Sequence, residues 1–183
     1  MNQIDLGLHG LKIIKPFNHE DDRGYFSEIW HEDLGLPEFK QINTSVSKLC
    51  TFRGLHYQWD KPQGKLIRVT KGSATFFELD IRAYSQTFGK YETINLDSKN
   101  NEWLWVPAGF ANGFFTLETD TTIVYMCTER WSKNEASIHR SVLDYPFNYF
   151  GSIRHISNKD DCAPSFDDSL DHLRSISGFF SDN

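Results

Sequence analysis

The segment Arg53-Gly54-Leu55-His56-Tyr57-Gln58 carries the clearest candidate for proton-transfer chemistry. Alternate side chains of an extended strand share a face, so Gly54, His56 and Gln58 are expected to point the same way. A histidine beside a glycine has room for a ligand next to its imidazole, which titrates near neutral pH. His56 is therefore a candidate general base. The plainer alternative is a buried histidine whose nitrogens are bound within the protein, and this segment alone leaves both open.

Two further clusters bear on this choice. Pro107-Ala108-Gly109-Phe110-Ala111-Asn112-Gly113-Phe114 reads as a turn that leads into a strand. Ser157-Asn158-Lys159-Asp160-Asp161 supplies carboxylates near the end of the chain. A buried carboxylate beside an imidazole fixes its tautomer and stabilises its charged form. A fold that brings these clusters to His56 would give it the surroundings of a catalytic base.

The elements that must position these groups read as short strands. In Phe39 to Ser47, apolar and polar residues alternate with the period of two expected of a half-buried strand. Regular turns rich in Gly, Pro, Asn and Asp separate the strands and favour a sandwich or barrel. The expected strands are Leu11–Phe17, Tyr25–Trp30, Phe39–Ser47, Phe52–Gln58, Lys65–Thr70, Thr75–Arg82, Tyr91–Leu96, Glu102–Val106, Gly113–Leu117 and Thr122–Thr128.

A helix is expected only near the C-terminus. Ser165 to Ser177 has apolar residues at helical spacing behind Asp167 and Asp168, and acidic residues suit a helix N-terminus. No G-x-G-x-x-G motif occurs, and no strand–helix–strand spacing indicates a dinucleotide-binding fold.

Composition limits the classes of partner. The 183 residues suit one domain, and 15% aromatic residues favour strands. A net charge of −6 without a basic stripe makes nucleic acid an unexpected partner, although clustered arginines can still bind a small anion. No apolar run approaches membrane length, and three widely spaced cysteines without a visible leader indicate a reduced, cytoplasmic protein.

Seven motifs in order between Leu11 and Pro164 resemble one family, the dTDP-4-dehydrorhamnose 3,5-epimerases. They are D-R-G-x-F, Q-x-N-x-S-x-S, R-G-L-H-x-Q, Q-G-K-L-x-R-V, D-I-R-x-x-S-x-T-F-G-K, P-x-G-F-A-x-G-F and S-x-K-D. The resemblance implies an all-β fold, a cupin-type jelly-roll barrel at about 10–130, with short C-terminal helices at about 165–177. It implies a single domain over 1–183, a homodimer with N-terminal strand exchange, a nucleotide-diphosphate sugar as substrate, and no cofactor.

The resemblance also implies roles for individual residues. His56 matches the general base, Asp160 rather than Asp161 the carboxylate that orients it, Lys65 the cation beside the sugar ketone, and Tyr125 the general acid. Such a set suits epimerisation, in which a base breaks a C–H bond beside a ketone and an acid returns a proton to the opposite face. Substrate-binding positions are matched by Arg23, Phe26, Glu28, Gln41, Asn43, Ser45, Arg53, Asn112 and Trp131.

Each of these residues has an alternative interpretation. Asp160 could be a helix cap, Tyr125 a core aromatic and Lys65 a solvated strand residue. Arg82 in Asp80-Ile81-Arg82 is interpreted as structural, with a partner across strands. The functional interpretation is preferred because all the matching positions occur together.

Two positions depart from the family pattern. Asn112 stands where the family has His, and Trp131 stands where it has Tyr. Asn can hydrogen-bond a hydroxyl but cannot carry a proton at neutral pH. We therefore expect an altered sugar specificity, or inversion at one carbon only. The sugar, the nucleotide and the pathway (O-antigen of lipopolysaccharide, capsule or a modified natural product) stay open.

Two other functions remain as alternatives, and the first is a metal-dependent oxygenase or isomerase. Many cupins bind a metal through H-x-H and a later His, but Gln58 and Asn112 occupy two of these places, and amides are poor ligands for a transition metal. No metal site is therefore expected. A catalytically inactive nucleotide-sugar-binding protein is the second alternative, although such a protein has no need of both an acid and a base.

Overall fold

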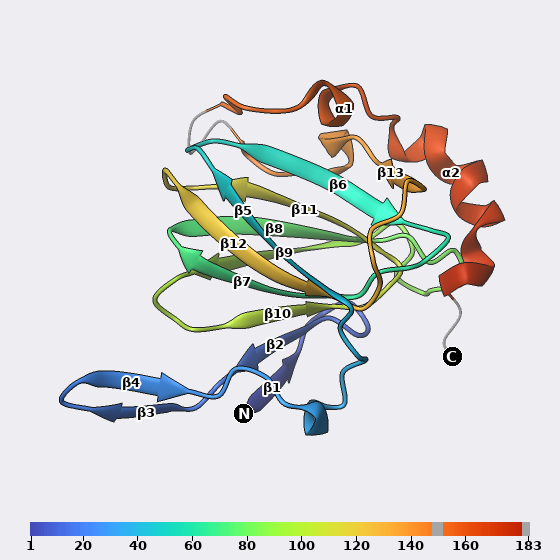
Figure 1. Cartoon of the computed structure of the whole chain (residues 1–183). Coiled ribbons are helices and arrows are strands. Elements are labelled where there is room, and N and C mark those ends of the chain that lie inside the picture. The colour runs from blue at the N-terminus through green and yellow to red at the C-terminus, as the bar shows by residue number, and fades with distance from the viewer. Residues whose placement is uncertain (148–151, 181–183) are drawn as a thin grey trace.

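Two antiparallel sheets make up most of the computed structural model, which describes residues 1–147 and 152–180. One has six strands, in the order β1 (Asn2–Asp5), β2 (Lys12–Lys15), β10 (Trp103–Val106), β7 (Lys65–Lys71), β12 (Thr121–Cys127) and β5 (Gln41–Ser47). The other has five, in the order β13 (Glu135–Ser137), β6 (Phe52–Gln58), β11 (Phe110–Thr116), β8 (Ser73–Asp80) and β9 (Tyr91–Asp97). The two sheets form a jelly-roll barrel, so the expected all-β class is confirmed (Figure 1).

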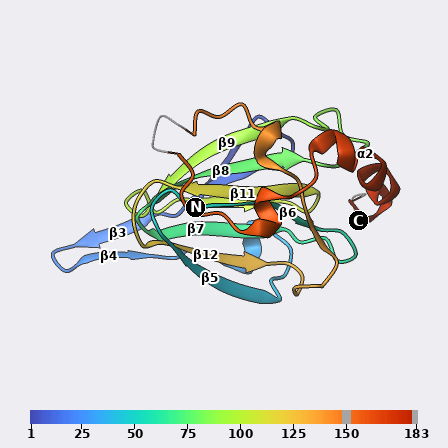
Figure 2. The ribbon, with the colours of Figure 1, turned by 90° about the horizontal axis from the view of Figure 1, so that it is seen from above.

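A hairpin and several short helices complete the described chain. Strands β3 (Asn18–Asp21) and β4 (Gly24–Ser27) pair only with each other and extend away from the two sheets in both views (Figures 1 and 2). The helices are η1 (Glu32–Leu34), η2 (Arg140–Val142), α1 (Asn158–Asp161), α2 (Phe166–Ser175) and η3 (Ser177–Phe180). Helix α2 lies at the opposite end of the molecule from the hairpin (Figure 2). None of the helices in the described part of the chain is long and apolar enough to cross a membrane.

The alternation of β8 builds two apolar layers. Phe76 is buried in the cluster between the sheets, whereas its neighbour Phe77 is buried in the cluster that also contains Leu173 and Ile176 of the C-terminal segment. Burying a phenylalanine stabilises the fold by roughly 1.5–3 kcal/mol. The C-terminal helix is thus held against the outer face of the five-stranded sheet.

Strand β5 has its polar face inward. Ile42 and Val46 are 66% and 60% exposed, while Gln41, Asn43 and Ser45 on the other face line the inside of the barrel. The expected period of two is present, but the usual arrangement of apolar residues inside is reversed. A polar cavity inside this end of the barrel is the physical reason.

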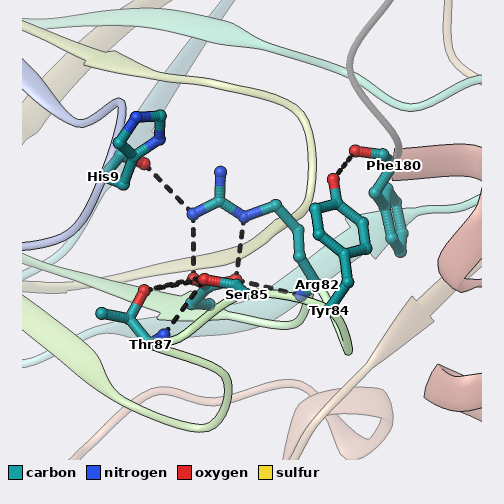
Figure 3. A network of polar contacts seen from close by, with 7 residues as sticks. His9, Arg82, Tyr84, Ser85, Thr87 and Phe180 are labelled. Atoms are coloured by element: carbon teal, nitrogen blue, oxygen red, sulfur yellow. Dashed lines mark hydrogen bonds and ion pairs between the residues drawn. The ribbon is translucent and has the colours of Figure 1, made fainter.

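Asp80 and Arg82 form a buried polar clamp. Figure 3 shows Arg82 together with its neighbours His9, Ser85 and Thr87. The Asp80 carboxylate accepts hydrogen bonds from Arg82 Nε at 2.9 Å and Nη2 at 2.8 Å, and from the hydroxyls of Ser85 and Thr87. Arg82 also donates to the His9 carbonyl at 3.1 Å. The main partner of Arg82 is therefore an acid two residues away, and the expected pairing across strands is wrong. The clamp joins the N-terminal segment to the β8–β9 connection.

Candidate active site

The polar face of β5 borders a cavity of about 380 Å³ inside the barrel. Its walls come from both sheets, with His56 and Arg53 on β6 and Lys65 and Tyr125 on β7 and β12. The lining residues are Gln41, Asn43, Ser45, Arg53, His56, Gln63, Lys65, Ile67, Phe76, Asn112, Phe114, Ile123, Tyr125, Trp131 and Glu135.

His56 and Asp160 form the central pair of this site. Nε2 of His56 lies 2.6 Å from Oδ1 of Asp160, whose side chain is only 4% exposed. Asp160 is held by helix α1, where the Ser157 hydroxyl accepts a hydrogen bond from the Asp160 amide. Because a carboxylate only accepts hydrogen bonds, Nε2 must carry the proton in this pair. Nδ1 is then left as the basic nitrogen.

The surroundings keep Asp160 ionised. Burial alone would raise the pKa of this carboxyl, but the hydrogen bond and charge of His56, with the Gly54 and Ser157 contacts, outweigh it and lower the pKa below 3.8. The carboxylate is therefore charged at neutral pH and stabilises a protonated His56.

A close approach of two glycines brings β6 and β11 together at this point. Gly54 has φ of +135°, and a Cβ on it would lie 2.5 Å from the Cα of Gly113. The register places His56 directly opposite Asn112. A side chain at Gly54 would push β11 away, so these glycines help to place His56 and Asn112 side by side at the cavity.

Tyr125 faces the cavity from the six-stranded sheet, whereas His56 faces it from the five-stranded sheet. Burial raises the pKa of the Tyr125 phenol, and the charges of Cys127 and Glu135 raise this pKa further. The charge of Arg53 lowers it, but by less. The phenol therefore stays protonated at neutral pH and can donate a proton. A base and an acid on opposite walls suit a reaction at two faces of one carbon.

Polar residues fix the rest of the wall. Gln41 donates to Asn43 Oδ1 at 2.9 Å and accepts a hydrogen bond from the Trp131 amide at 2.9 Å. Arg53 Nε donates to the Ser47 hydroxyl at 3.2 Å. The Trp131 residue is 62% exposed and lines the cavity.

Three predicted substrate-binding residues do not lie in this cavity. Arg23 is in the turn of the β3–β4 hairpin, where it pairs with Asp21 at 2.6 Å, and Phe26 on β4 is 71% exposed. Glu28 directly follows β4 and is also exposed. Of the ten other predicted site residues, nine line the cavity and the tenth, Asp160, contacts His56. Arg23, Phe26 and Glu28 do not line this cavity within one copy of the chain.

Several cavity residues were not predicted. Gln63 lies in the Q-G-K motif, which was the available signal for it. Glu135 sits on a strand too short to be read from periodicity. Ile67, Phe76, Phe114 and Ile123 are apolar strand residues that look like ordinary core, and they give the polar cavity an apolar floor.

The residues present do not fit a transition metal. Nε2 of His56 is bound to Asp160, and the Gln58 amide donates to the carbonyls of Lys61 and Arg130. Within residues 1–147 and 152–180, no three His, Cys, Asp or Glu side chains come together as a metal site would require.

Residues 5–168 match the family model described as dTDP-4-dehydrorhamnose 3,5-epimerase. A relative of that name from Sinorhizobium fredii is 42% identical over 137 residues, which is 69% of each chain. The Salmonella typhimurium relative of that name is 35% identical over 179 residues, which is 91% of this chain and 96% of the relative.

The solved structures agree with the sequence comparison. The structure of dTDP-6-deoxy-D-glucose-3,5-epimerase from Legionella pneumophila in complex with dTDP-4-keto-L-rhamnose superposes with a TM-score of 0.86. It is 34% identical and covers 94% of this chain and 96% of its own. With a family model that spans most of its length and a jelly-roll barrel shared with the Legionella enzyme, the chain belongs to the dTDP-4-dehydrorhamnose 3,5-epimerase family.

Proposed function

We propose that the chain epimerises a nucleotide-linked 4-keto-6-deoxyhexose by proton abstraction and return, without a metal. The observation that carries the proposal is the His56–Asp160 pair on one wall of the cavity, with Tyr125 on the other wall. A C–H bond next to a ketone is acidic enough for a positioned imidazole to break. Family membership supports the same reaction class.

His56 takes the proton in this mechanism. Asp160 holds the proton on Nε2, so Nδ1 accepts the hydrogen from the ring carbon and the imidazole becomes cationic. The Asp160 carboxylate stabilises this cation, and its lowered pKa keeps it charged while it does so. The electron pair of the C–H bond moves to the ketone, which becomes an enolate.

Lys65 and Tyr125 complete the reaction. The Lys65 ammonium supplies positive charge to the enolate oxygen inside a partly enclosed site, where such charge is worth more than in water. The Tyr125 phenol then delivers a proton to the opposite face of the ring carbon. Net change is inversion at that carbon, with one proton taken by His56 and one given by Tyr125.

The polar wall suits a nucleotide-diphosphate sugar. Arg53 can make charge-assisted hydrogen bonds to the diphosphate, while the amides of Gln41 and Asn43 can bind the base or sugar. We propose dTDP as the nucleotide because the Legionella relative was solved with dTDP-4-keto-L-rhamnose.

Asn112 and Trp131 decide which carbons are inverted or which sugar is taken.

Incubation of the chain with dTDP-4-keto-6-deoxyglucose in deuterium oxide tests the proposal, with NMR of the sugar ring as the measurement. Label at C3 or C5 supports epimerisation. Equal label at both carbons would rule out inversion at one carbon only, and binding of the sugar with no label at either carbon would favour a binding protein without activity.

A homodimer that exchanges its N-terminal hairpins is the proposed assembly. The hairpin extends from the body and exposes Phe26, and the outer face of β5 exposes Ile42 and Val46. Contact with a second copy would cover these exposed apolar side chains. In such a dimer Arg23, Phe26 and Glu28 would reach the cavity of the partner. We further propose that the chain acts as one domain in the cytoplasm.

A further inference from the structure

A buried carboxyl lies directly behind the candidate site. Glu78 on β8 is 0% exposed and stands opposite Asn112 in the register of β8 and β11. Its Oε1 accepts a hydrogen bond from Asn112 Nδ2 at 2.5 Å, and its Oε2 has no hydrogen-bond partner among the described residues. Burying a carboxyl without an ion pair is costly, so an apolar residue here would make a more stable barrel.

Asn112 links this carboxyl to Lys65. Its Nδ2 points to Glu78, and its Oδ1 faces the Lys65 ammonium at 3.5 Å. An ammonium can only donate hydrogen bonds, and Oε1 of the carboxyl here accepts one. The two neighbours therefore hold the Asn112 amide in a single orientation, with its oxygen toward the cavity cation.

The electrostatics of Glu78 agree with this geometry. Burial raises the pKa of its carboxyl well above the ordinary value, while the hydrogen bond from Asn112 and the charge of Lys65 act in the opposite direction. Lys65 and Glu78 thus interact through Asn112, although they come from different sheets.

We propose that Glu78 is a positioning residue, which fixes the Asn112 amide so that Asn112 holds the Lys65 ammonium in place for the developing enolate. The inference rests on the proposed function. Without an acceptor at position 78 the amide can turn and direct its NH2 group at Lys65. Two donors would then face each other, and the ammonium would move from the position where the oxyanion forms.

The first experiment measures steady-state kinetics of Glu78→Leu, which removes the acceptor at similar volume. We expect kcat to fall about 10- to 100-fold with KM within about threefold, because Lys65 acts on the transition state more than on the bound ground state. Glu78→Gln keeps an accepting oxygen and should recover most of the loss. If Glu78→Leu does not fold, Glu78→Met, an unbranched apolar residue, takes its place.

A control on the same strand separates stability from positioning. Thr75 is buried on the opposite face of β8 and donates to Asn95 Oδ1 at 2.7 Å. Thr75→Val should lower Tm and leave kcat unchanged. Equal losses of kcat in Thr75→Val and Glu78→Leu would overturn the proposal, since both would then reflect a weakened fold.

A double-mutant cycle tests whether Glu78 acts through Asn112. In an Asn112→Ala background, Glu78→Leu should have little further effect on kcat. The same loss in both backgrounds, or unchanged kcat for Glu78→Leu in the wild-type background, would contradict the proposal.

Proton NMR of the Asn112 side-chain amide provides a readout that does not depend on activity. One amide proton should resonate downfield of the usual range in the wild type and return to that range in Glu78→Leu, with the signal assigned by its loss in Asn112→Ala. An unchanged signal would overturn the inference. If the wild-type chain exchanges no sugar hydrogen, the proposed function fails, and the NMR result alone decides whether Glu78 fixes Asn112.

Discussion

At the scale of single residues, the proposed roles of His56, Asp160 and Tyr125 rest on which of their atoms are already bound. Nε2 of His56 is occupied by Asp160, and the phenol of Tyr125 is held in its protonated form by burial and by neighbouring charge. In the proposed mechanism, His56 therefore acts on one face of the ring carbon and Tyr125 acts on the opposite face. This division makes the two halves of the reaction separable by substitution.

Tyr125→Phe should separate proton abstraction from inversion. His56 can still remove and return the ring proton on its own face, so deuterium from solvent should enter the sugar while epimer formation falls about 100-fold or more. NMR for label and reduction followed by sugar analysis for inversion would measure the two rates. Equal losses of both rates would show that Tyr125 is not the second-face acid.

Asp160→Asn should lower kcat by roughly 10²- to 10⁴-fold, because an amide can donate to Nε2 and favour the wrong tautomer of His56. Asp161 is the matched control, since it is the adjacent acid and binds Arg140 Nη1 at 2.8 Å instead of His56. Asp161→Asn should keep kcat within about twofold. A larger loss in Asp161→Asn than in Asp160→Asn would reverse the assignment.

The motif residues around the cavity could be predicted from the sequence because they belong to seven motifs whose order and spacing resemble one family. Glu78 could not, since a single glutamate between apolar strand residues gives no sign that its side chain is buried. Arg23, Phe26 and Glu28 were predicted from the resemblance, but in the proposed dimer their place depends on a second copy of the chain. A single sequence carries no direct signal for that.

At the scale of elements, the β8–β9 connection depends on the Asp80–Arg82 clamp. Asp80 is fully buried, and its carboxylate is saturated by Arg82, Ser85 and Thr87. Burial would raise its pKa, but these hydrogen bonds together lower it below 3.8. The clamp is a matched buried pair, so removing one partner leaves the other charge uncompensated.

Asp80→Asn should destabilise the fold by about 3–5 kcal/mol at neutral pH, because Arg82 is left buried without its carboxylate. The folded-state pKa of Asp80 lies below its unfolded value, so its stabilisation is present above about pH 4 and is lost as the pH falls through the folded pKa. Thermal unfolding should therefore show a constant difference in Tm from wild type between about pH 5 and 7, and a smaller difference below pH 4. A difference that grows on acidification would contradict this account.

Strand positions were predictable where periodicity or turns were clear. The expected strand Phe52–Gln58 agrees with β6 at both ends, and the helix expected at Ser165–Ser177 is observed as Phe166–Ser175 with Ser165 as its cap. The strands β1 and β3 were missed because all of their residues are exposed and neither alternates in polarity. Their pairing depends on tertiary contacts that local sequence does not specify.

At the scale of the whole molecule, the hairpin of another copy completes each cavity in the proposed dimer. The β3–β4 hairpin, whose residues include Arg23 and Phe26, extends away from the two sheets in both views (Figures 1 and 2). The outer face of β5 exposes Ile42 and Val46. The barrel itself supplies the acid and the base. Substrate binding and catalysis would therefore be divided between two copies.

Co-expression of His56→Asn and Arg23→Ala chains tests this division. In an exchanged dimer, a mixed pair contains one site with an intact barrel and an intact hairpin, so the mixture should recover about a quarter of wild-type activity. Each variant alone should have far less. Activity is assayed for each purified variant and for the co-purified mixture. If the hairpin served its own barrel, mixing the two chains would restore no activity.

The most direct test of His56 as the base that removes the ring proton is the rate of deuterium incorporation into dTDP-4-keto-6-deoxyglucose. This rate is compared between the wild type and His56→Asn in deuterium oxide. Asparagine keeps a polar, uncharged side chain near Asp160 but cannot act as a base at neutral pH. We expect ready incorporation at C3 or C5 with the wild type, and at least a 100-fold slower rate with His56→Asn at unchanged Tm. Incorporation by His56→Asn at the wild-type rate would contradict this role of His56.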